Sequence, residues 1–202
     1  MARPRSNIEP RIVHAARKRF LREGVDGASL RRIAHDARTS IGMIYYYFPT
    51  KNDLFLAVVE EIYGRFLDDL EKVLRHDVPV PERLRRLSVR LGAMGSTELD
   101  VMRLVAREAM TSSARRERLV QRFLRGHVGM LLQTLSEGIA AGDIDSRHHP
   151  LVLMMATLAV AGVPQAMRKL IGRAFPDAPE SDALAGALID ILFHGIAQRS
   201  PA

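Results

Sequence analysis

The chain contains no cysteine among its 202 residues. Disulfide bonds, thiolate metal sites and cysteine nucleophiles are therefore excluded, and the composition is compatible with a cytoplasmic protein. Long hydrophobic runs are also lacking, because the longest apolar stretch, Leu151 to Val163, is shorter than the roughly 20 residues that a membrane span needs. We interpret this stretch as a core helix of a soluble protein with no membrane partner. The basic N-terminus has no apolar signal core behind it, which argues against export.

Sequence motifs that carry enzymatic chemistry are missing as well. The chain has no Gly-x-Ser-x-Gly nucleophile elbow, no phosphate-binding glycine loop and no metal-binding helix motif. His127, His148 and His149 do not form a metal-ligand pattern, because adjacent histidines point in different directions. Asp143 and Asp145 lack the remaining ligands of a calcium loop. The sequence therefore predicts neither an enzyme nor a cofactor nor a metal site.

The net charge of +7 is confined to the beginning of the chain. Residues 1–52 hold eleven lysines and arginines against four acidic residues, whereas residues 53–202 hold nineteen of each. A basic excess limited to one segment suggests a polyanionic partner there. Nucleic acid is one such partner and an anionic membrane surface is a second, while an ordinary solvated basic surface is the alternative to both.

Apolar residues recur three and four positions apart along nearly the whole chain, which predicts an all-α protein of about nine helices. The first three helices are expected at about 9–23, 29–37 and 40–46, with Gly24 ending the first and Ser29 capping the second. Thr50 and Asp53 predict a capping box for a long fourth helix that reaches about residue 75. Later helices are expected at about 82–95, 98–112, 115–141, 151–173 and 182–198.

Two short helices joined by a tight turn in a basic setting define a helix-turn-helix candidate. We expect residues 1–50 to form this three-helix, homeodomain-like DNA-binding domain. Residues 51–202 are expected to form a helical body for ligand binding and dimerisation, and the helix at about 51–75 would connect the two domains.

The second short helix must present short side chains to the major groove, because base edges lie close to its backbone. Ile41 and Met43 are expected to contact thymine methyl groups, and Arg32 or Arg38 to donate hydrogen bonds. Phosphate contacts are expected at helix starts, from a lysine and from tyrosine hydroxyls. The residues predicted to contact DNA are Ser29, Arg32, Arg38, Thr39, Ser40, Ile41, Gly42, Met43, Tyr45, Tyr46, Thr50 and Lys51.

The segment from Ala34 to Phe55 resembles the signature of the TetR family of bacterial transcription regulators. That signature pairs an alanine-glycine-valine-serine turn with a leucine-tyrosine-x-x-phenylalanine helix end, which a lysine, an acidic residue and a leucine follow. The matching positions are Ser40, Gly42, Tyr45, Phe48, Pro49, Lys51, Asp53 and Leu54, with Phe20, Gly24, Ser29, Ile33 and Ala34 upstream. Two residues depart from it: Arg38 replaces a frequent glycine of the turn, and Ile41 replaces a frequent lysine or arginine. The departures leave the fold expectation intact and the operator sequence open.

The resemblance implies a homodimer that binds a near-palindromic DNA operator, represses transcription and releases the DNA when a small molecule binds the body. An activator or a co-repressor-dependent regulator is the alternative within regulation. A helical module that does not touch DNA is the alternative outside it, against which the uneven charge argues.

Members of the family usually pair their two C-terminal helices into a four-helix interface, and small residues on both of these helices permit such close packing here. Burial of both helices in the core of one chain is the alternative. The residues expected at the dimer interface are Ala156, Ala159, Val160, Val163, Ala183, Gly186, Ala187, Asp190, Ile191 and His194.

Methionines gather in the body, where their flexible side chains suit either an adaptable apolar pocket or an ordinary core. We expect a mainly apolar cavity that accepts a small apolar or aromatic effector. The residues predicted to line it are Phe66, Met94, Met102, Leu104, Met110, Phe123, His127, Met130, Leu131 and Met155.

Overall fold

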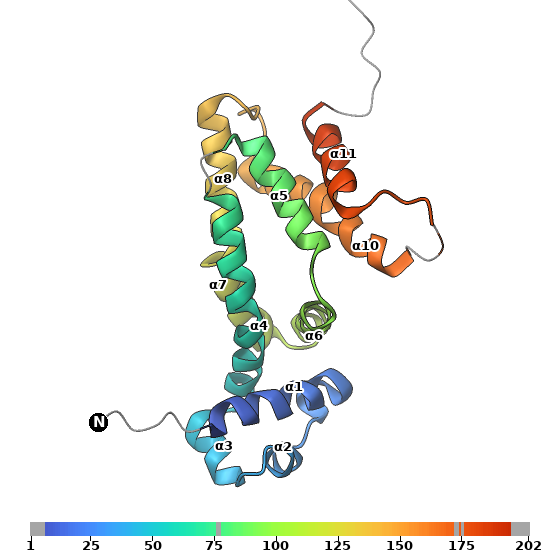
Figure 1. Ribbon diagram of the computed structural model, residues 1–202. Coiled ribbons are helices and arrows are strands. Elements are labelled where there is room, and N and C mark those ends of the chain that lie inside the picture. Colours follow the sequence, from blue (N-terminus) through green and yellow to red (C-terminus); the bar gives the residue numbers. More distant parts are fainter. Residues whose placement is uncertain (1–6, 76–77, 172–173, 175, 195–202) are drawn as a thin grey trace, which may run out of the picture. The chain divides into compact units, whose positions relative to one another are not determined.

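All regular secondary structure in the described residues is helical, which confirms the predicted all-α fold class (Figure 1). The structure is a computed structural model, and it describes residues 7–75, 78–171, 174 and 176–194. The predicted end of the last helix, at residue 198, lies outside the described residues.

The chain divides into two compact units by packing. The first unit holds the residues up to Phe66 together with Gly95–Arg122, and the second holds Leu67–Met94 together with the residues from Phe123 onward. This division groups helices that contact one another. The functional boundary expected near residue 50 is a different division, and it stays a prediction.

The first unit is built around a three-helix head, which we define as α1 to α3. Its helices are α1 (Ile8–Gly27), α2 (Leu30–Asp36), α3 (Ile41–Tyr47), the first part of α4 (Lys51–Leu74), α6 (Ser96–Thr111) and nearly all of α7 (Ser113–Leu124). Figure 1 shows α1 crossing over α2, and α1 also contacts α6. Phe20 of α1 and Phe55 of α4 are fully buried and meet edge to face, with ring centroids 6.5 Å apart.

Gly24 interrupts α1, as the sequence predicts. Its φ of 75° and ψ of 168° are non-helical, and the helical turn that follows reaches Gly27. A positive φ is costly for residues with a Cβ atom, so glycine is the residue type that suits this break. The break separates the long amphipathic part of α1, which buries Ile12, Ala16 and Phe20, from the approach to α2.

The second unit contains α5 (Val80–Gly92), α8 (His127–Ala141), α9 (Pro150–Thr157), η1 (Leu158–Gly162), α10 (Val163–Ile171) and α11 (Ser181–His194). Figure 1 shows α5 beside α11, and α5 also contacts η1, α10 and α8. The run from α9 through η1 to α10 is continuous, and it corresponds to the helix expected at 151–173. Its π-helical part ends at Gly162, two residues before Pro164, whose missing N–H and bulky ring disfavour regular α-helix in the preceding turn.

The prediction of one helix over 115–141 is wrong, because the chain breaks at Gly126 between α7 and α8. Gly126 has a φ of −111° and a ψ of −122°, outside the helical region. A Cβ atom on Gly129 would lie 2.8 Å from the carbonyl oxygen of Leu124. Two glycines three positions apart therefore allow the backbone to fold back closely on itself.

The apolar run near the C-terminus differs from the core helix that the sequence predicts. Leu151, Val152, Met155 and Val163 are all at least 50% exposed. Residues 150–168 are also long and apolar enough to cross a membrane by length and composition alone, with a mean hydropathy of 1.6 and 22% of the window buried. The expectation that no run reaches this length is therefore wrong. One such helix is weak evidence for a membrane, because core helices of soluble proteins meet the same criterion.

The inward face of this run carries polar rather than large apolar side chains. Gln165 is fully buried, and its amide donates hydrogen bonds to the Ser88 hydroxyl at 3.4 Å and to the Ser181 carbonyl at 2.9 Å. The Ser181 hydroxyl donates in turn to the amide oxygen of Gln165 at 3.1 Å. The Ser88 hydroxyl donates to the Ala161 carbonyl at 2.8 Å. This network joins α5, the α9–α10 run and the start of α11.

Gly92 makes this network possible, and its replacement by alanine should destabilise the protein. A Cβ atom there would lie 2.2 Å from the Ser181 hydroxyl oxygen and 2.4 Å from the Gln165 amide oxygen. Both groups are held by hydrogen bonds, so we expect Gly92→Ala to lower the free energy of unfolding by about 2 kcal/mol. Chemical denaturation measures it. Gly64→Ala is the control, because its Cβ would meet only the Glu60 carboxylate at 3.7 Å. Equal stability of the two variants would contradict the expectation.

Candidate nucleic-acid interface

Helix α3 presents one apolar face inward and one polar face outward. Ile44 and Phe48, four residues apart, are buried and anchor the helix, whereas Tyr45 is 52% and Tyr46 76% exposed. Gly42 is exposed on the same outer side, and a Cβ atom on it would meet only the Ser40 hydroxyl at 3.7 Å. The fold therefore does not require glycine at residue 42, which leaves close approach of a partner to the backbone as its use.

The start of α3 is capped by Ser40, whose hydroxyl accepts a hydrogen bond from the Met43 amide at 3.3 Å. Ser29 holds the corresponding position before α2, but its side chain makes no capping hydrogen bond. Ser29 is thus the N-cap residue of α2, as expected, but without a capping hydrogen bond from its side chain. The hydroxyl is half-buried beside the helix start.

The turn between α2 and α3 is closed by backbone hydrogen bonds. The Thr39 amide donates to the Ala34 carbonyl and the Arg38 amide to the His35 carbonyl, each at 3.0 Å. These two bonds define a Schellman motif, which places the residue after the C-cap in the left-handed region. Arg38 occupies that position with a φ of 52°. Arg38, the departure from glycine noted in the sequence, thus adopts a backbone conformation that glycine would adopt without strain.

The capping box predicted at the start of α4 is present. The Thr50 amide donates to the Asp53 carboxylate at 2.9 Å, and the Asp53 amide donates to the Thr50 hydroxyl at 3.1 Å. The hydrogen bond from the Thr50 hydroxyl, and a second from Arg118, hold the pKa of Asp53 below its usual range. The box occupies two amides of this helix start and leaves those of Lys51 and Asn52 pointing outward as donors for an anion.

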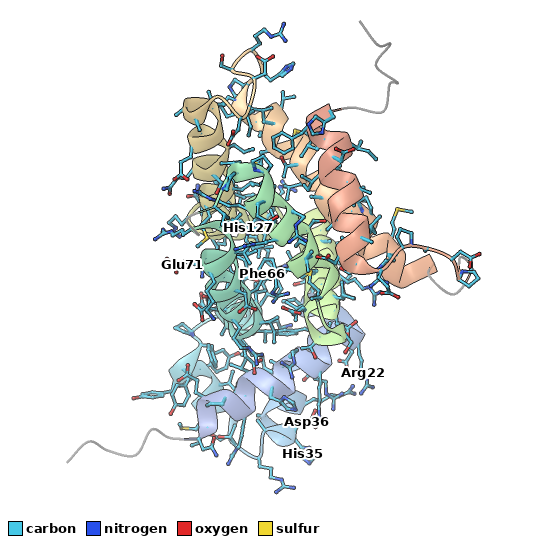
Figure 2. The ribbon with its side chains drawn as sticks, turned by 45° about the horizontal axis from the view of Figure 1, so that its top comes forward. Arg22, His35, Asp36, Phe66, Glu71 and His127 are labelled. Carbon is cyan, nitrogen blue, oxygen red and sulfur yellow. The ribbon has the colours of Figure 1, made fainter. Side chains whose placement is uncertain are left out.

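Two acidic side chains of the head are paired with the same arginine. Arg19 of α1 donates to Asp36 at 2.7 Å and to Glu23 at 2.9 Å, and this hydrogen bond lowers the pKa of Asp36. Figure 2 shows Asp36 at the end of α2, with the exposed His35 beside it. Arg32 and Arg38 are exposed and, within the described residues, form no ion pair. Their guanidinium groups are therefore available to an external anion.

A buried ion pair joins the end of α1 to α6 and α7. Glu108 is 3% and Arg115 4% exposed, and their charged atoms lie 3.0 Å apart. Glu108 also accepts the Val25 amide at 3.2 Å, just after the break in α1. Arg115 reaches the Asp26 carboxylate through both terminal nitrogens, at 2.9 and 2.6 Å, and lowers the pKa of that carboxyl. Sequence reasoning missed this cluster, because no local pattern marks charged residues that pair across such separations.

Two further arginines of α7 form ion pairs with acidic residues of α4. Arg118 donates to Asp53 at 2.7 Å, and Arg122 donates to Glu60 at 2.8 and 2.6 Å. Lys51, expected to contact phosphate, donates to the Asp26 carbonyl at 3.0 Å. A phosphate contact by this lysine therefore requires its flexible side chain to leave that carbonyl.

The predicted DNA-contacting residues all lie between the N-cap of α2 and the start of α4. The predicted ligand-lining residues are spread over both units, and three of them are exposed, with Met102 at 53%, Met110 at 79% and Met155 at 61%. The rings of Phe123 and His127 are in contact in the second unit, tilted by 52° with centroids 5.0 Å apart. The ligand-lining set as a whole stays a prediction.

The residues predicted for the dimer interface lie in the second unit, and none of them is buried. Ala159, Val163 and Ile191 are among the exposed members. An interface between copies requires accessible residues, so these positions are compatible with the prediction without testing it.

Known proteins are similar to this chain in sequence and in fold. The family model described as "Bacterial regulatory proteins, tetR family" matches residues 12–58. The chain is 30% identical over 180 residues to the HTH-type transcriptional repressor SCO4008 of Streptomyces coelicolor, which spans 85% of this chain and 87% of that protein. It is 41% identical over 75 residues to the HTH-type transcriptional repressor NicS of Pseudomonas putida, which spans 37% of this chain and 35% of NicS.

Two solved structures of regulators show the same fold. The transcriptional regulator FadR from Bacillus subtilis, in complex with stearoyl-CoA, superposes with a TM-score of 0.74 at 19% identity, over 93% of this chain and 99% of that chain. AibR, in complex with isovaleryl coenzyme A and operator DNA, superposes with a TM-score of 0.65 at 20% identity, over 93% and 98%.

The fold and the exposed α3 define a helix-turn-helix transcription regulator. The chain belongs to the tetR family of bacterial regulatory proteins. This confirms the predicted family and the prediction of a regulator rather than an enzyme, because its relatives are named transcriptional repressors.

Gly42→Ala should separate folding from DNA binding. The added methyl group has room within the protein and alanine favours helix, so the free energy of unfolding should stay the same or rise by up to about 1 kcal/mol. If the α3 backbone approaches base edges, affinity for a duplex selected from a random pool should fall about tenfold or more. Fluorescence anisotropy measures it, with Gly64→Ala of α4 as the control. Unchanged affinity would show that α3 does not approach DNA closely at this residue.

Proposed function

We propose that the protein is a transcriptional repressor that binds a palindromic operator as a homodimer and is released by a small-molecule effector. The observation that carries the proposal is the outer side of α3, where Gly42, Tyr45 and Tyr46 are exposed beside the turn. Arg32 and Arg38 flank that surface without carboxylate partners among the described residues. Such a surface fits the major groove, with phosphate contacts from the open amides at the start of α4.

The second unit supports pairing of two copies. Met155, Ala159, Val163 and Met167 follow one another at four-residue spacing and are all exposed. A helix with this spacing presents a continuous apolar stripe, which a second copy could cover. On α11, Ala183, Ala187 and Ile191 form a second exposed row at the same spacing. The four-helix interface expected from the sequence would bring these two rows together with those of a partner.

The effector that we propose is an apolar compound, with acyl-CoA thioesters as the first class to test. Two regulators that share this fold were solved with stearoyl-CoA and with isovaleryl coenzyme A. The methionines of the chain suit the binding of flexible acyl chains, because thioether side chains adapt to irregular apolar shapes. A regulator of this kind would act in the cytoplasm, where both its operator and coenzyme A are found.

Selection of duplexes from a random pool tests the DNA-binding proposal. We expect a palindromic sequence, because two equivalent heads must read two equivalent half-sites. Lys51→Ala should weaken binding to all duplexes alike and reduce the salt dependence by about one phosphate contact per protomer. Met43→Ala should instead change the preference at particular base pairs.

Anisotropy titrations of the selected duplex and of a scrambled duplex, at several salt concentrations, distinguish the two variants. Binding that is independent of salt, or failure to select any duplex, would refute the proposal. A selected sequence without palindromic symmetry would refute the homodimer.

Acyl-CoA thioesters of increasing chain length should release the selected duplex. We expect release to strengthen with chain length, because each buried methylene contributes about 0.8 kcal/mol. Anisotropy with added octanoyl-CoA, palmitoyl-CoA and unacylated coenzyme A measures the effect. Tighter duplex binding on addition of palmitoyl-CoA would indicate a co-repressor, and release by unacylated coenzyme A alone would contradict an apolar effector.

A further inference from the structure

Arg38 occupies a turn of the head where the backbone favours glycine. Its φ of 52° lies in the left-handed region, and no other non-glycine residue of the described chain has a positive φ. A side chain with a Cβ atom destabilises this conformation relative to extended or right-handed alternatives. The two backbone hydrogen bonds of the turn favour the observed geometry from within, and an interaction from outside the turn adds to them.

Arg11 of α1 makes that interaction. Its Nε donates to the Ala37 carbonyl at 3.1 Å, and its Nη2 donates to the Arg38 carbonyl at 2.9 Å. The guanidinium group thus spans two consecutive carbonyls, one on either side of the left-handed residue. A planar fork with donors in fixed positions fixes the orientation of both peptide groups, which a single point charge does not.

The packing of α1 fixes the position of the backbone at Arg11. The next residue, Ile12, is fully buried, and α1 packs along α2 in the first unit. The carbonyls that Arg11 contacts also belong to the C-terminal end of α2, where the helix dipole favours a positive charge. Both effects stabilise the guanidinium at this place.

The peptide group after Arg38 leads directly into the start of α3. Thr39 and Ser40 follow, and Ser40 caps the helix whose next residues are expected to read bases. A change in the turn geometry would tilt α3 relative to α1 and α2. Since base contacts depend on distances within about an ångström, such a tilt would affect specific binding far more than phosphate contacts.

We infer that Arg11 is a positioning residue for operator reading: it holds the strained Arg38 turn so that α3 has the orientation that base contacts require. The inference rests on the proposed function in that the operator is read by α3. It assigns a role in specificity to a residue of α1 that need not touch a base.

Arg11→Lys is the decisive variant, because it keeps the charge and removes the fork. We expect affinity for the selected duplex to fall about fivefold to tenfold, while affinity for a scrambled duplex and the dependence on salt stay unchanged. Arg11→Ala should lower the affinity for the selected duplex further than Arg11→Lys does. Arg22→Ala is the matched control, because Arg22 is an exposed arginine at the other end of α1 (Figure 2). Anisotropy at several salt concentrations measures all three.

Two outcomes of these titrations would overturn the inference. Arg11→Lys with unchanged affinity for the selected duplex would show that the fork is unnecessary. An equal loss on both duplexes in Arg11→Ala, beyond that of Arg22→Ala and with a weaker salt dependence, would show that Arg11 contacts phosphate directly.

A double-variant cycle tests the link to strain. Glycine accepts a positive φ without cost, so the Arg38→Gly background should reduce the effect of Arg11→Lys to less than about twofold. An undiminished effect of Arg11→Lys in that background would overturn the role in holding Arg38.

Hydrogen exchange provides a readout that does not depend on the operator. The Arg38 and Thr39 amides close the turn, and they should exchange at least about tenfold faster in Arg11→Lys than in the unaltered protein. Equal protection would overturn the inference even if no operator had been found. Faster exchange of these amides, together with failure of the duplex selection, would uphold the structural role and refute the proposed function instead.

Discussion

The buried pair of Glu108 and Arg115 is the interaction on which the first unit depends. Two ionised groups this deeply buried are costly to desolvate, and the geometry offsets that cost only because each group has further partners. Glu108 accepts the Val25 amide that the break at Gly24 leaves without a helical partner, and Arg115 extends to Asp26. The pair therefore does more than cross-link α6 and α7. It satisfies the backbone at the point where α1 stops being a regular helix.

The same principle governs the other end of the head. The turn before α3 presents two backbone carbonyls, and the guanidinium group of Arg11 in α1 donates a hydrogen bond to each of them. A small three-helix head has little apolar core with which to fix the orientation of its outermost helix. Hydrogen bonds from arginines to backbone carbonyls supply direction as well as stability, which apolar contacts do not. The contacts of Arg11 with the turn thus help to fix the orientation of the exposed helix α3.

The sequence predicts a feature well when the residues that determine it lie close together along the chain, and poorly when they lie far apart. The capping box of Thr50 and Asp53, the stop at Gly24 and the buried face of α3 are local, and residues three or four positions apart determine them. Arg11 lies 26 residues from Ala37, and Glu108 lies 83 residues from Val25. Neither pairing has a periodic signature, because arginines and glutamates on helices are usually solvated. The break at Gly126 was missed for a different reason: apolar spacing continues across it, and only the two nearby glycines indicate a turn.

The run from α9 to α10 has the reverse of the usual polarity of a soluble helix. Its inward residues Thr157, Ala161 and Gln165 are small or polar, and Gln165 approaches α5 closely where Gly92 has no side chain. Its large apolar residues, such as Met155 and Val163, face outward instead. An exposed apolar stripe costs free energy in water, so an apolar partner on the outer face would stabilise this arrangement. Lipid would cover it, but the neighbouring α11 carries an exposed Asp190–His194 pair at 2.7 Å, which lipid would not solvate. In the homodimer proposed above, a second copy of the chain would cover this face and accommodate the charged pair.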